Sequence, residues 1–122
     1  MCTQYLGRVE VVATDNFRTW YDELDDAASD DVDVAVEVLS QLGVLLGHPR
    51  SSAIKGATFA LRELRIQSNG RPLRVFYAFD PARNAVLIIG GDKTGDQRFY
   101  DTMIGASEKI WKEYLDETAK VE

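Results

Sequence analysis

Apolar and polar residues follow one spacing in the middle of the chain and another toward its two ends. Up to about residue 47, apolar residues recur three and four positions apart, which is the period of an amphipathic helix. Between residues 59 and 89 the spacing is mostly two, the period of a half-buried strand. The helical period returns after residue 98. The pattern therefore predicts helices, then strands, then a last helix, all preceded by a short strand over residues 8–13.

Two helices are predicted before residue 47. The first follows a cap at Asp15 and Asn16, and its apolar face contains Phe17, Trp20, Tyr21 and Leu24. An acidic turn is expected over residues 25–31. The second helix is predicted over residues 32–46, with Gly47 as its C-cap and Pro49 as its stop. Its apolar stripe contains Val34, Val38, Leu42 and Leu45, with Val36 and Leu39 beside it.

Three consecutive strands are predicted over residues 59–66, 73–79 and 85–89, after a basic loop over residues 50–56. The turns at residues 68–70 and 80–84 are short enough to join neighbouring antiparallel strands. Gly90 and Gly91 are expected to end the third strand. A last helix is predicted over residues 98–117, with a buried stripe of Phe99, Met103, Ala106, Ile110 and Tyr114.

The predicted element order is β-α-α-β-β-β-α, which is an α+β fold. Three strands joined by short turns form an antiparallel meander, and the two N-terminal helices are expected to cover one of its faces. No repeat or linker divides residues 1–122, so we expect a single domain.

The chain contains one cysteine and one histidine, Cys2 and His48. A single cysteine forms no internal disulfide, which favours a reducing cytoplasm, and one of each residue is too few for a zinc site. The longest apolar runs fall far short of the ~20 residues that span a bilayer. The N-terminus has no signal-peptide pattern. We therefore expect a cytoplasmic protein with no membrane segment, no metal and no cofactor.

The net charge of −6 argues at first against a nucleic-acid partner, but the charge is unevenly distributed. Residues 1–47 carry ten acidic and two basic residues, a net charge of −8. Residues 48–100 carry nine basic and four acidic residues, a net charge of +5, whereas residues 101–122 have a net charge of −3. Because charges act over a Debye length of ~8 Å at physiological salt, the local excess matters most. The predicted strands are therefore the positive part of the molecule.

Three features that could carry chemistry have simpler explanations. The aspartates between Asp25 and Asp33 could bind Mg²⁺, but they also fit a solvated turn and a helix N-terminus. His48 is expected to be a loop residue at a helix end. Residues 90–95 lack Walker A spacing because Asp92 precedes Lys93, although this turn can present Lys93 beside a helix N-terminus.

Basic residues and a tyrosine remain as candidates for a site. RNA can be cleaved without a metal when its own 2′-OH attacks the adjacent phosphate, provided that cations stabilise the charged transition state. A tyrosine among cations can have a lowered pKa and take part in the proton transfer. The residues suited to this reaction are Arg65, Arg74, Lys93, Arg98 and Tyr100.

The placement of the arginines is only partly determined by the pattern. Alternation puts Glu63 and Arg65 on one face of a strand and Arg62 on the other, and the hairpin brings Arg65 near Arg74. The arginines could equally be surface charges, or ion-pair partners of Glu63 and Asp80.

The chain resembles the RelE/HigB-like toxins of bacterial type II toxin–antitoxin systems, members of the RelE/ParE superfamily, most densely from residue 54 to 115. The matching segments, in order, are residues 61–65 (LRELR), 71–79 (RPLRVFYAF), 86–95 (VLIIGGDKTG) and a final helix with Ala106 and residues 111–114. Their order and spacing agree with the predicted layout.

The resemblance implies a small sheet backed by helices and, for RelE-like members, a ribosome-dependent endoribonuclease that cuts mRNA and inhibits translation. It implies catalytic roles for Arg65, Arg74, Lys93, Arg98 and Tyr100, and RNA binding by Lys55, Arg62 and Arg71. The implied partners are the ribosome with its mRNA and a cognate antitoxin. This antitoxin is expected to be a helix-turn-helix protein encoded next door, and operator DNA is contacted only through it.

The chain departs from the family pattern at three points. Asp92 stands where many relatives have a first lysine, Gly95 and Asp96 replace a usual proline, and the net charge is negative. Two alternatives therefore stay open: a non-enzymatic, ParE-like inhibitor of DNA gyrase, and an inactive binding module of the same fold.

Overall fold

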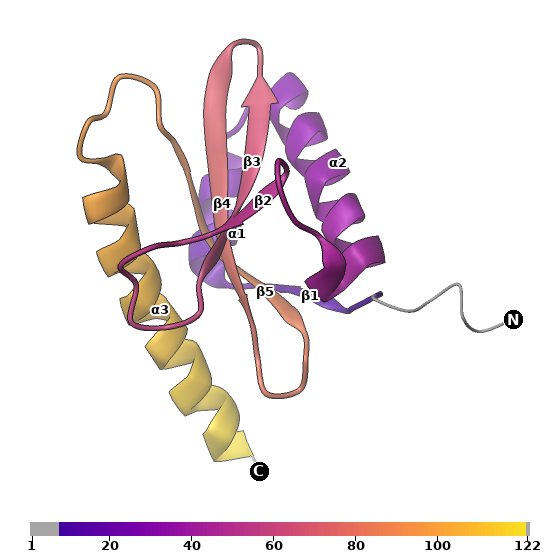
Figure 1. The fold of residues 1–122 in the computed structure, drawn as a ribbon, viewed down its shortest axis with the longest axis vertical. Helices are drawn as coiled ribbons and strands as arrows, with labels where there is room; N and C mark the ends of the chain where they lie inside the picture. The colour runs from indigo at the N-terminus through magenta and orange to yellow at the C-terminus, as the bar shows by residue number, and fades with distance from the viewer. Residues whose placement is uncertain (1–7, 122) are drawn as a thin grey trace, which may run out of the picture.

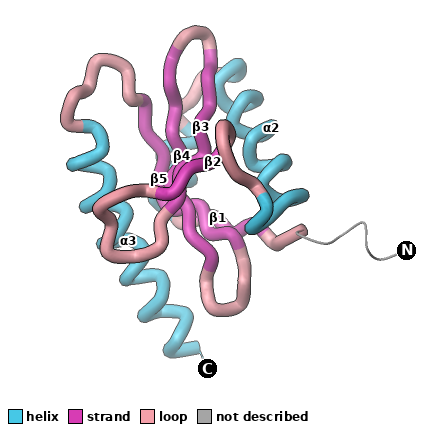
Figure 2. Tube along the Cα trace, viewed as in Figure 1, coloured by secondary structure: helices cyan, strands magenta, loops and turns pink. Residues whose placement is uncertain are grey.

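The N-terminal helices pack on one face of a five-stranded sheet and a long C-terminal helix packs on the other (Figure 1). The structure is a computed structural model that describes residues 8–121. Its elements, shown by type in Figure 2, are β1 (Val11–Ala13), α1 (Asp15–Asp22), α2 (Asp26–Leu42), the 3-10 helix η2 (Gly43–Leu45), β2 (Ser51–Ala53), β3 (Arg62–Ser68), β4 (Arg71–Phe79), β5 (Ala85–Asp92) and α3 (Phe99–Val121). Cys2 lies outside the described residues.

The sheet has the strand order β1-β5-β4-β3-β2. The predicted α+β class and the antiparallel meander of β3, β4 and β5 are confirmed. Two pairings were not predicted: β1 runs parallel to β5, and β2 pairs antiparallel with β3. β2 lies inside the predicted basic loop, because three residues are too few to show an alternation.

Alternation along β4 separates the two hydrophobic cores. Val75 and Tyr77 belong to the core under α1 and α2, which also contains Leu64 and Leu87. Ala78 belongs to the core under α3, where it joins Leu61, Val86, Ile88 and Trp111. The central strand is therefore buried on both faces, as its nearly continuous apolar run requires.

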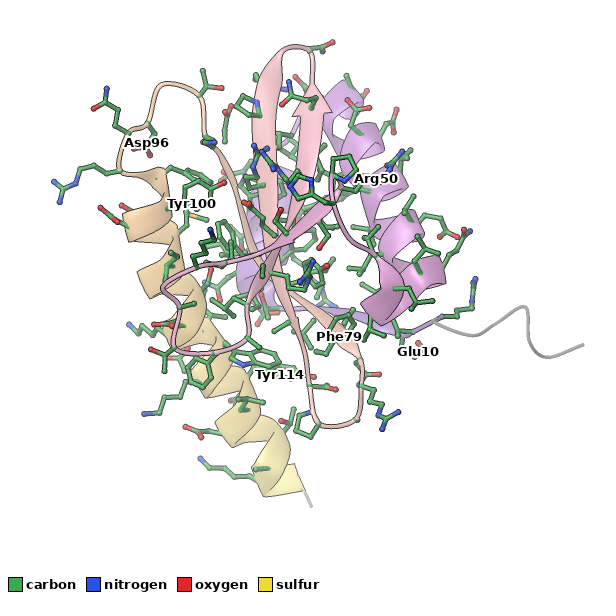
Figure 3. The ribbon with its side chains drawn as sticks, viewed as in Figure 1. Glu10, Arg50, Phe79, Asp96, Tyr100 and Tyr114 are labelled. Carbon is green, nitrogen blue, oxygen red and sulfur yellow. The ribbon has the colours of Figure 1, made fainter. Side chains whose placement is uncertain are left out.

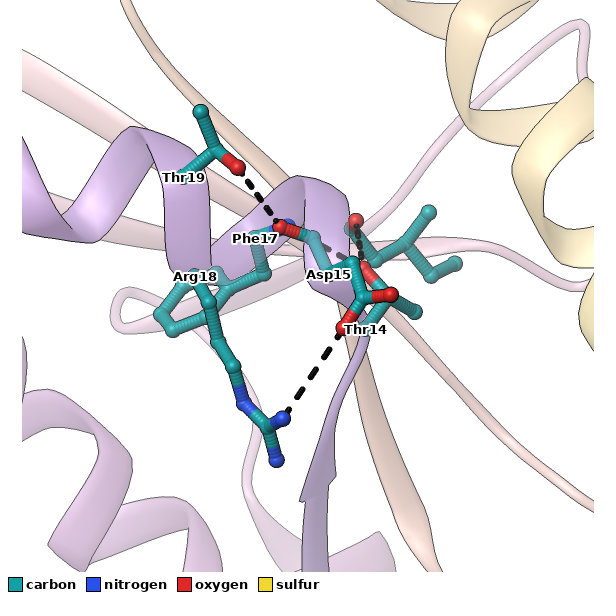
Figure 4. A network of polar contacts seen from close by, with 6 residues as sticks. Thr14, Asp15, Phe17, Arg18 and Thr19 are labelled. Atoms are coloured by element: carbon teal, nitrogen blue, oxygen red, sulfur yellow. Dashed lines mark hydrogen bonds and ion pairs between the residues drawn. The ribbon is translucent and has the colours of Figure 1, made fainter.

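The start of α1 is joined to β5 by Thr14, not by the predicted cap at Asp15 and Asn16 (Figure 4). The Thr14 hydroxyl accepts from the backbone N–H of Phe17 at 3.0 Å and donates to the Ile88 carbonyl at 2.6 Å. One side chain thus caps the helix and holds it on the sheet.

The predicted acidic turn over residues 25–31 is wrong, because this segment begins α2. Asp25 is the N-cap and accepts from the backbone N–H of Ala28 at 2.9 Å. Aspartates are favourable in the first turns of a helix, where they face the positive end of its dipole. The predicted end is also wrong: Gly43, with a φ of 54°, is the C-cap, and Gly47 lies beyond η2.

α2 buries a different face from the predicted stripe. Its buried residues are Ala28, Val32, Ala35 and Leu39. In the predicted stripe, Val34 is 58% exposed, Leu42 41% and Leu45 68%. Ala28 and Ala35 are small, so they fit between the helix and the sheet. The size of a side chain, and not only its hydrophobicity, therefore determines which face of α2 is buried.

Gly90 and Gly91 lie inside β5 and do not end it. A Cβ atom on Gly90 would lie 2.2 Å from a ring atom of Trp20, and one on Gly91 would lie 2.9 Å from the ring of Phe99. The glycines are therefore places where aromatic side chains of α1 and α3 rest directly on the strand.

α3 is longer than predicted, and its most buried residues are Phe99, Ser107 and Trp111. Of the predicted stripe, only Phe99 is fully buried; Met103, Ala106, Ile110 and Tyr114 are half-buried. Trp111 was missed because it follows Ile110 directly and falls outside the selected spacing. None of the helices in residues 8–121 combines the length and hydropathy needed to cross a membrane.

Candidate functional site

The hydroxyl of Tyr100 lies between a carboxylate and a guanidinium. It donates to Glu63 Oε1 at 2.7 Å, and Arg74 Nε donates to it at 3.4 Å. Arg74 Nε is also 3.5 Å from Glu63 Oε1, which closes a three-membered cluster. The three residues come from α3, β3 and β4, so the site exists only after the sheet and α3 have assembled.

The strand register places the two charged residues of this cluster on the same sheet face. Glu63 pairs with Phe76 and Arg65 with Arg74, and directly paired residues of antiparallel strands share a face. This is the face that α3 covers. Arg74 is 5% exposed and Glu63 7%, so neither is a surface charge.

The first turn of α3 is held in place by aromatic contacts. Phe99 rests on Gly91, and the rings of Phe99 and Tyr100 lie 5.3 Å apart in an edge-to-face arrangement. Tyr100 also meets Phe76 edge-on at 6.3 Å. In Figure 3, Tyr100 lies at the start of α3, below the loop that carries Asp96. These contacts leave the Tyr100 ring little freedom.

The pKa of Tyr100 is raised, not lowered as the sequence suggested. Burial is the main cause, and the hydrogen bond to the Glu63 carboxylate adds to it; the hydrogen bond from Arg74 opposes the shift without cancelling it. At neutral pH the Tyr100 hydroxyl therefore keeps its proton and acts as a donor.

Lys93 extends this cluster toward solvent. Its Nζ lies 5.2 Å from the centre of the Tyr100 ring, within the range of a cation–π contact. Its backbone N–H donates to the Pro72 carbonyl at 3.0 Å, which fixes the chain just after β5. Lys93 is half-buried, so its charge remains accessible.

Asp92 does not oppose Lys93 in the site. Its Oδ1 accepts from the backbone N–H of Thr94 at 2.9 Å and from the Thr94 hydroxyl at 2.6 Å. The hydrogen bond from the Thr94 hydroxyl is the main cause of the lowered pKa of Asp92. Asp92 pairs with Leu73 and thus lies on the other sheet face from Arg74. The carboxylate closes the turn that presents Lys93.

The structure brings three of the five predicted catalytic residues into contact: Arg74, Lys93 and Tyr100. Arg65 is the register partner of Arg74, but its side chain is exposed and makes no hydrogen bond or ion pair with the residues described. Arg98 is also exposed, and no side-chain contact joins it to the cluster within residues 8–121.

The three predicted RNA-binding residues lie away from the cluster. Arg62 donates from Nε to the Ser51 hydroxyl at 3.0 Å, and Ser51 is hydrogen-bonded to buried Tyr77. Arg71 forms an ion pair with Asp25 at 3.4 Å. Both arginines are on the α2 side of the sheet. Lys55 is exposed in the loop after β2.

Glu63 is the cluster member that the sequence did not single out as functional. The predicted alternation placed Glu63 on the same strand face as Arg65, without deciding which face is buried. Glutamate is almost never fully buried without a partner, so a glutamate within a predicted strand of the sheet was the available signal. The interpretation that an arginine pairs with Glu63 is confirmed, and the arginine is Arg74. The interpretation that an arginine pairs with Asp80 is wrong, because the Asp80 carboxylate accepts hydrogen bonds from Asn84 and Tyr114.

The acidic residues of the described part of the chain are not gathered around one point. No three His, Cys, Asp or Glu side chains are grouped there so as to hold a metal ion.

Comparisons with known proteins place the chain in a family. Two proteins of Mycobacterium tuberculosis (strain ATCC 25618 / H37Rv) are similar to it. The first, named "Putative toxin HigB2", is 36% identical over 99 residues, which are 79% of this chain and 49% of that protein. The second, named "Putative toxin HigB3", is 34% identical over 107 residues, which are 86% of this chain and 92% of that protein.

The chain thus spans about half of the first relative and most of the second. No solved structure matches the chain. Residues 19–112 match the family described as "Phage derived protein Gp49-like (DUF891)", and this segment contains the whole cluster. Because the match covers well over half of the chain, this protein belongs to the Gp49-like family of phage-derived proteins.

Proposed function

We propose that this chain is the toxin of a type II toxin–antitoxin system and that it cleaves RNA at the Glu63–Arg74–Tyr100 cluster. The names of the two relatives support the toxin assignment. The observation that carries the cleavage assignment is the Tyr100 hydroxyl, held between a carboxylate and a guanidinium beside the accessible cation of Lys93.

The proposed reaction uses the 2′-OH of the RNA as the nucleophile. The 2′ oxygen forms a bond to phosphorus, the bond from phosphorus to the 5′ oxygen breaks, and the products are a 2′,3′-cyclic phosphate and a 5′-OH. Tyr100, which is half-buried, gives its proton to the leaving 5′ oxygen, and the proton of the 2′-OH is released to water. Tyr100 then takes a proton back from water, so the protein ends as it began, and the buried Glu63 carboxylate orients the Tyr100 hydroxyl throughout.

The cations have the task of stabilising negative charge on the phosphate. Lys93 and Arg65 are the accessible ones on this side of the sheet, and they supply charge where it develops. Arg74 is buried, so its role is to orient Tyr100 and to balance Glu63. Four further cations lie outside the cluster, and we propose them as contacts to the RNA only: Lys55, Arg62, Arg71 and Arg98.

We further propose that cleavage requires the ribosome, as the resemblance to RelE-like toxins implies. The partner that silences the toxin is then a cognate antitoxin, expected to be a helix-turn-helix protein encoded in the neighbouring reading frame. On this proposal the chain acts in the cytoplasm.

The experiment that tests this function compares the wild-type chain with Tyr100→Phe under inducible expression. The phenylalanine keeps the ring contacts with Phe76 and removes only the hydroxyl, so the fold is retained. We expect growth arrest and new 5′-OH ends within translated mRNA for the wild type, with cleavage reduced about 10²-fold or more in the variant. Arg83→Ala, at an exposed turn far from the site, is the control that should behave as wild type.

Other outcomes point to other functions. Intact mRNA together with a DNA-damage response would indicate the gyrase inhibitor, and no effect on growth would indicate a binding module. If the purified chain cleaves naked RNA as fast as it cleaves ribosome-bound mRNA, the ribosome requirement is contradicted, but the cleavage activity is not.

A further inference from the structure

Gly91 on β5 lies beside Arg74 of the candidate site. The two residues are register partners, and directly paired residues of antiparallel strands share a sheet face, so Gly91 is on the face that α3 covers. The φ angle of Gly91 is not positive, so its backbone has a conformation that residues with a side chain also adopt. What glycine contributes at this position is therefore the missing side chain.

The space that Gly91 leaves open is filled by Phe99, at the start of α3. A Cβ atom on Gly91 would lie 2.9 Å from the nearest carbon of the Phe99 ring and 3.2 Å from the terminal methyl group of Met103. The flexible end of Met103 can turn away from such an atom, but the aromatic ring has to move as a whole. Any side chain at position 91 therefore lifts Phe99 off the strand.

The Phe99 ring is enclosed by its neighbours. It is 3% exposed, and its centre lies 6.0 Å from that of Phe76 and 5.3 Å from that of Tyr100. Rotation brings the ring against these two neighbours, and translation away from β5 carries the first turn of α3 with it. In either case a methyl group on Gly91 displaces Tyr100, because the interior is close-packed.

The contacts of the Tyr100 hydroxyl tolerate little displacement. Arg74 Nε lies 3.4 Å from the hydroxyl oxygen. A donor–acceptor distance of about 3.6 Å is no longer a hydrogen bond, so a shift of about 0.2 Å away from β4 loses this contact. The same shift lengthens the 2.7 Å hydrogen bond to Glu63. The depth at which Phe99 lies on β5 therefore decides whether the three polar groups meet.

The neighbouring residue Gly90 offers a matched comparison. It faces the other side of β5, where a Cβ atom would collide with the ring of Trp20 on α1. Alanine at position 90 thus disturbs the packing of α1, whereas alanine at position 91 disturbs the packing of α3. The same change at two adjacent positions therefore separates a general loss of packing from a displacement of Tyr100.

We propose that Gly91 is a positioning residue of the candidate site: its missing side chain sets the depth at which Phe99 is seated on β5, and thereby the place of the Tyr100 hydroxyl. Seated in this way, the hydroxyl meets both Glu63 and Arg74. The importance of this placement for cleavage rests on the proposed function, whereas the placement itself does not.

The first readout is the ionisation of Tyr100. It is measured on the full chain for the wild type, Gly91→Ala and Gly90→Ala, each with and without Tyr100→Phe, as the difference in tyrosinate absorbance within each pair during an alkaline titration. Burial is the main cause of the raised pKa of Tyr100, followed by the hydrogen bond to Glu63. We expect Gly91→Ala to weaken both, so that the pKa falls toward the ordinary value of about 10. Gly90→Ala should leave the Tyr100 titration unchanged.

The second readout is cleavage of ribosome-bound mRNA by the same variants. Displacing a proton donor slows the reaction more than it weakens RNA binding, so for Gly91→Ala we expect kcat to fall at least about tenfold and KM to stay within about twofold. Gly90→Ala, assayed at a temperature at which circular dichroism shows it folded, should keep the kcat of the wild type. Equal losses of kcat in the two variants would overturn the positioning role.

A further variant keeps the test decisive if Gly91→Ala does not fold. Phe99→Leu removes the support of the Tyr100 ring without adding a methyl group, and it should by itself lower the pKa of Tyr100. Adding Gly91→Ala to Phe99→Leu should then have little further effect, because leucine has no ring carbon at the contact. An unchanged titration in Phe99→Leu, or a large further shift in the double variant, would overturn the action through Phe99.

The two readouts also separate this proposal from the proposed function. If the wild type does not cleave but Gly91→Ala lowers the pKa of Tyr100, the cleavage is contradicted and the placement of Tyr100 by Gly91 is supported. If the wild type cleaves but Gly91→Ala titrates like the wild type, the cleavage stands and the placement is overturned.

Discussion

At the scale of single residues, two arginines of the same face have opposite environments. Arg65 and Arg74 are register partners on β3 and β4, yet Arg65 is exposed and Arg74 is buried against Glu63 and Tyr100. The difference arises because α3 starts above Arg74 and leaves Arg65 at the open edge of the sheet. Residue type and strand face therefore do not by themselves decide whether a cation binds substrate or holds the site together.

The two arginines should differ in their effect on stability. Arg74→Ala removes the partner of a buried carboxylate, and we expect the free energy of unfolding to fall by about 3 kcal/mol. Arg65→Ala, the matched control, should change it by no more than about 0.5 kcal/mol. Urea denaturation followed by circular dichroism measures both values. Equal effects of the two substitutions would mean that Glu63 is not held as a buried ion pair.

Tyr100 should titrate above the ordinary range of tyrosine. Its pKa is raised in the folded chain, so its contribution to stability is complete below about pH 10, the ordinary value in the unfolded chain, and is lost as the pH rises through the folded value. The difference in absorbance at 295 nm between the wild type and Tyr100→Phe during an alkaline titration reports this group alone. If it ionises below pH 10, Tyr100 has the lowered pKa that the sequence suggested, which would contradict the raised pKa of the folded chain.

At the scale of elements, the contacts between helices and strands decide where each element ends. β5 continues through Gly90 and Gly91 because Trp20 and Phe99 pack on its backbone at those two places. α2 begins at Asp26 because Asp25 caps it. A glycine pair and a run of aspartates usually mark the end of an element. Here the glycine pair lies inside a strand, and the aspartates lie at the start of a helix.

Two glycine-to-alanine substitutions should therefore have opposite effects. Gly90→Ala places a methyl group into the ring of Trp20 and should destabilise the fold by about 1–3 kcal/mol. Gly105→Ala lies in α3 with no atom within 4 Å of the new methyl group, and it should stabilise the fold by about 0.5–1 kcal/mol. Thermal denaturation of the two variants beside the wild type checks both signs, and a stabilised Gly90→Ala would contradict the packing of Trp20 on β5.

At the scale of the whole molecule, charge is separated between layers. α1 and α2 contain most of the negative charge of residues 1–47, whereas the accessible cations Arg65, Lys93 and Arg98 lie on β3 and in the segment after β5. The net charge of −6 therefore gives little information on what the sheet binds. The protein should therefore contact few phosphates of a bound RNA, because these accessible cations are few.

RNA binding should accordingly show a shallow dependence on salt. If Arg65, Lys93 and Arg98 each neutralise one phosphate of a single strand, the slope of log K against log salt concentration is about −2. Fluorescence anisotropy with a short labelled RNA and the Tyr100→Phe variant, which does not cleave, measures this slope. Arg65→Ala should reduce it, and Arg83→Ala, at the turn between β4 and β5, should leave it unchanged. A slope unaffected by Arg65→Ala would exclude that residue from the RNA path.

The sequence by itself determined the fold class, the meander and the order of the elements apart from β2, because these follow from the period of apolar residues, which is a local property. It also identified Arg74, Lys93 and Tyr100, which the structure brings together. Only the tertiary structure decided which face each residue takes: that α2 buries its alanines and leaves Val34 and Leu42 outside, and that Glu63 lies under Tyr100. The reason is physical. Period depends on neighbours along the chain, whereas burial and pKa depend on groups from other elements, and those meet only when the layers pack.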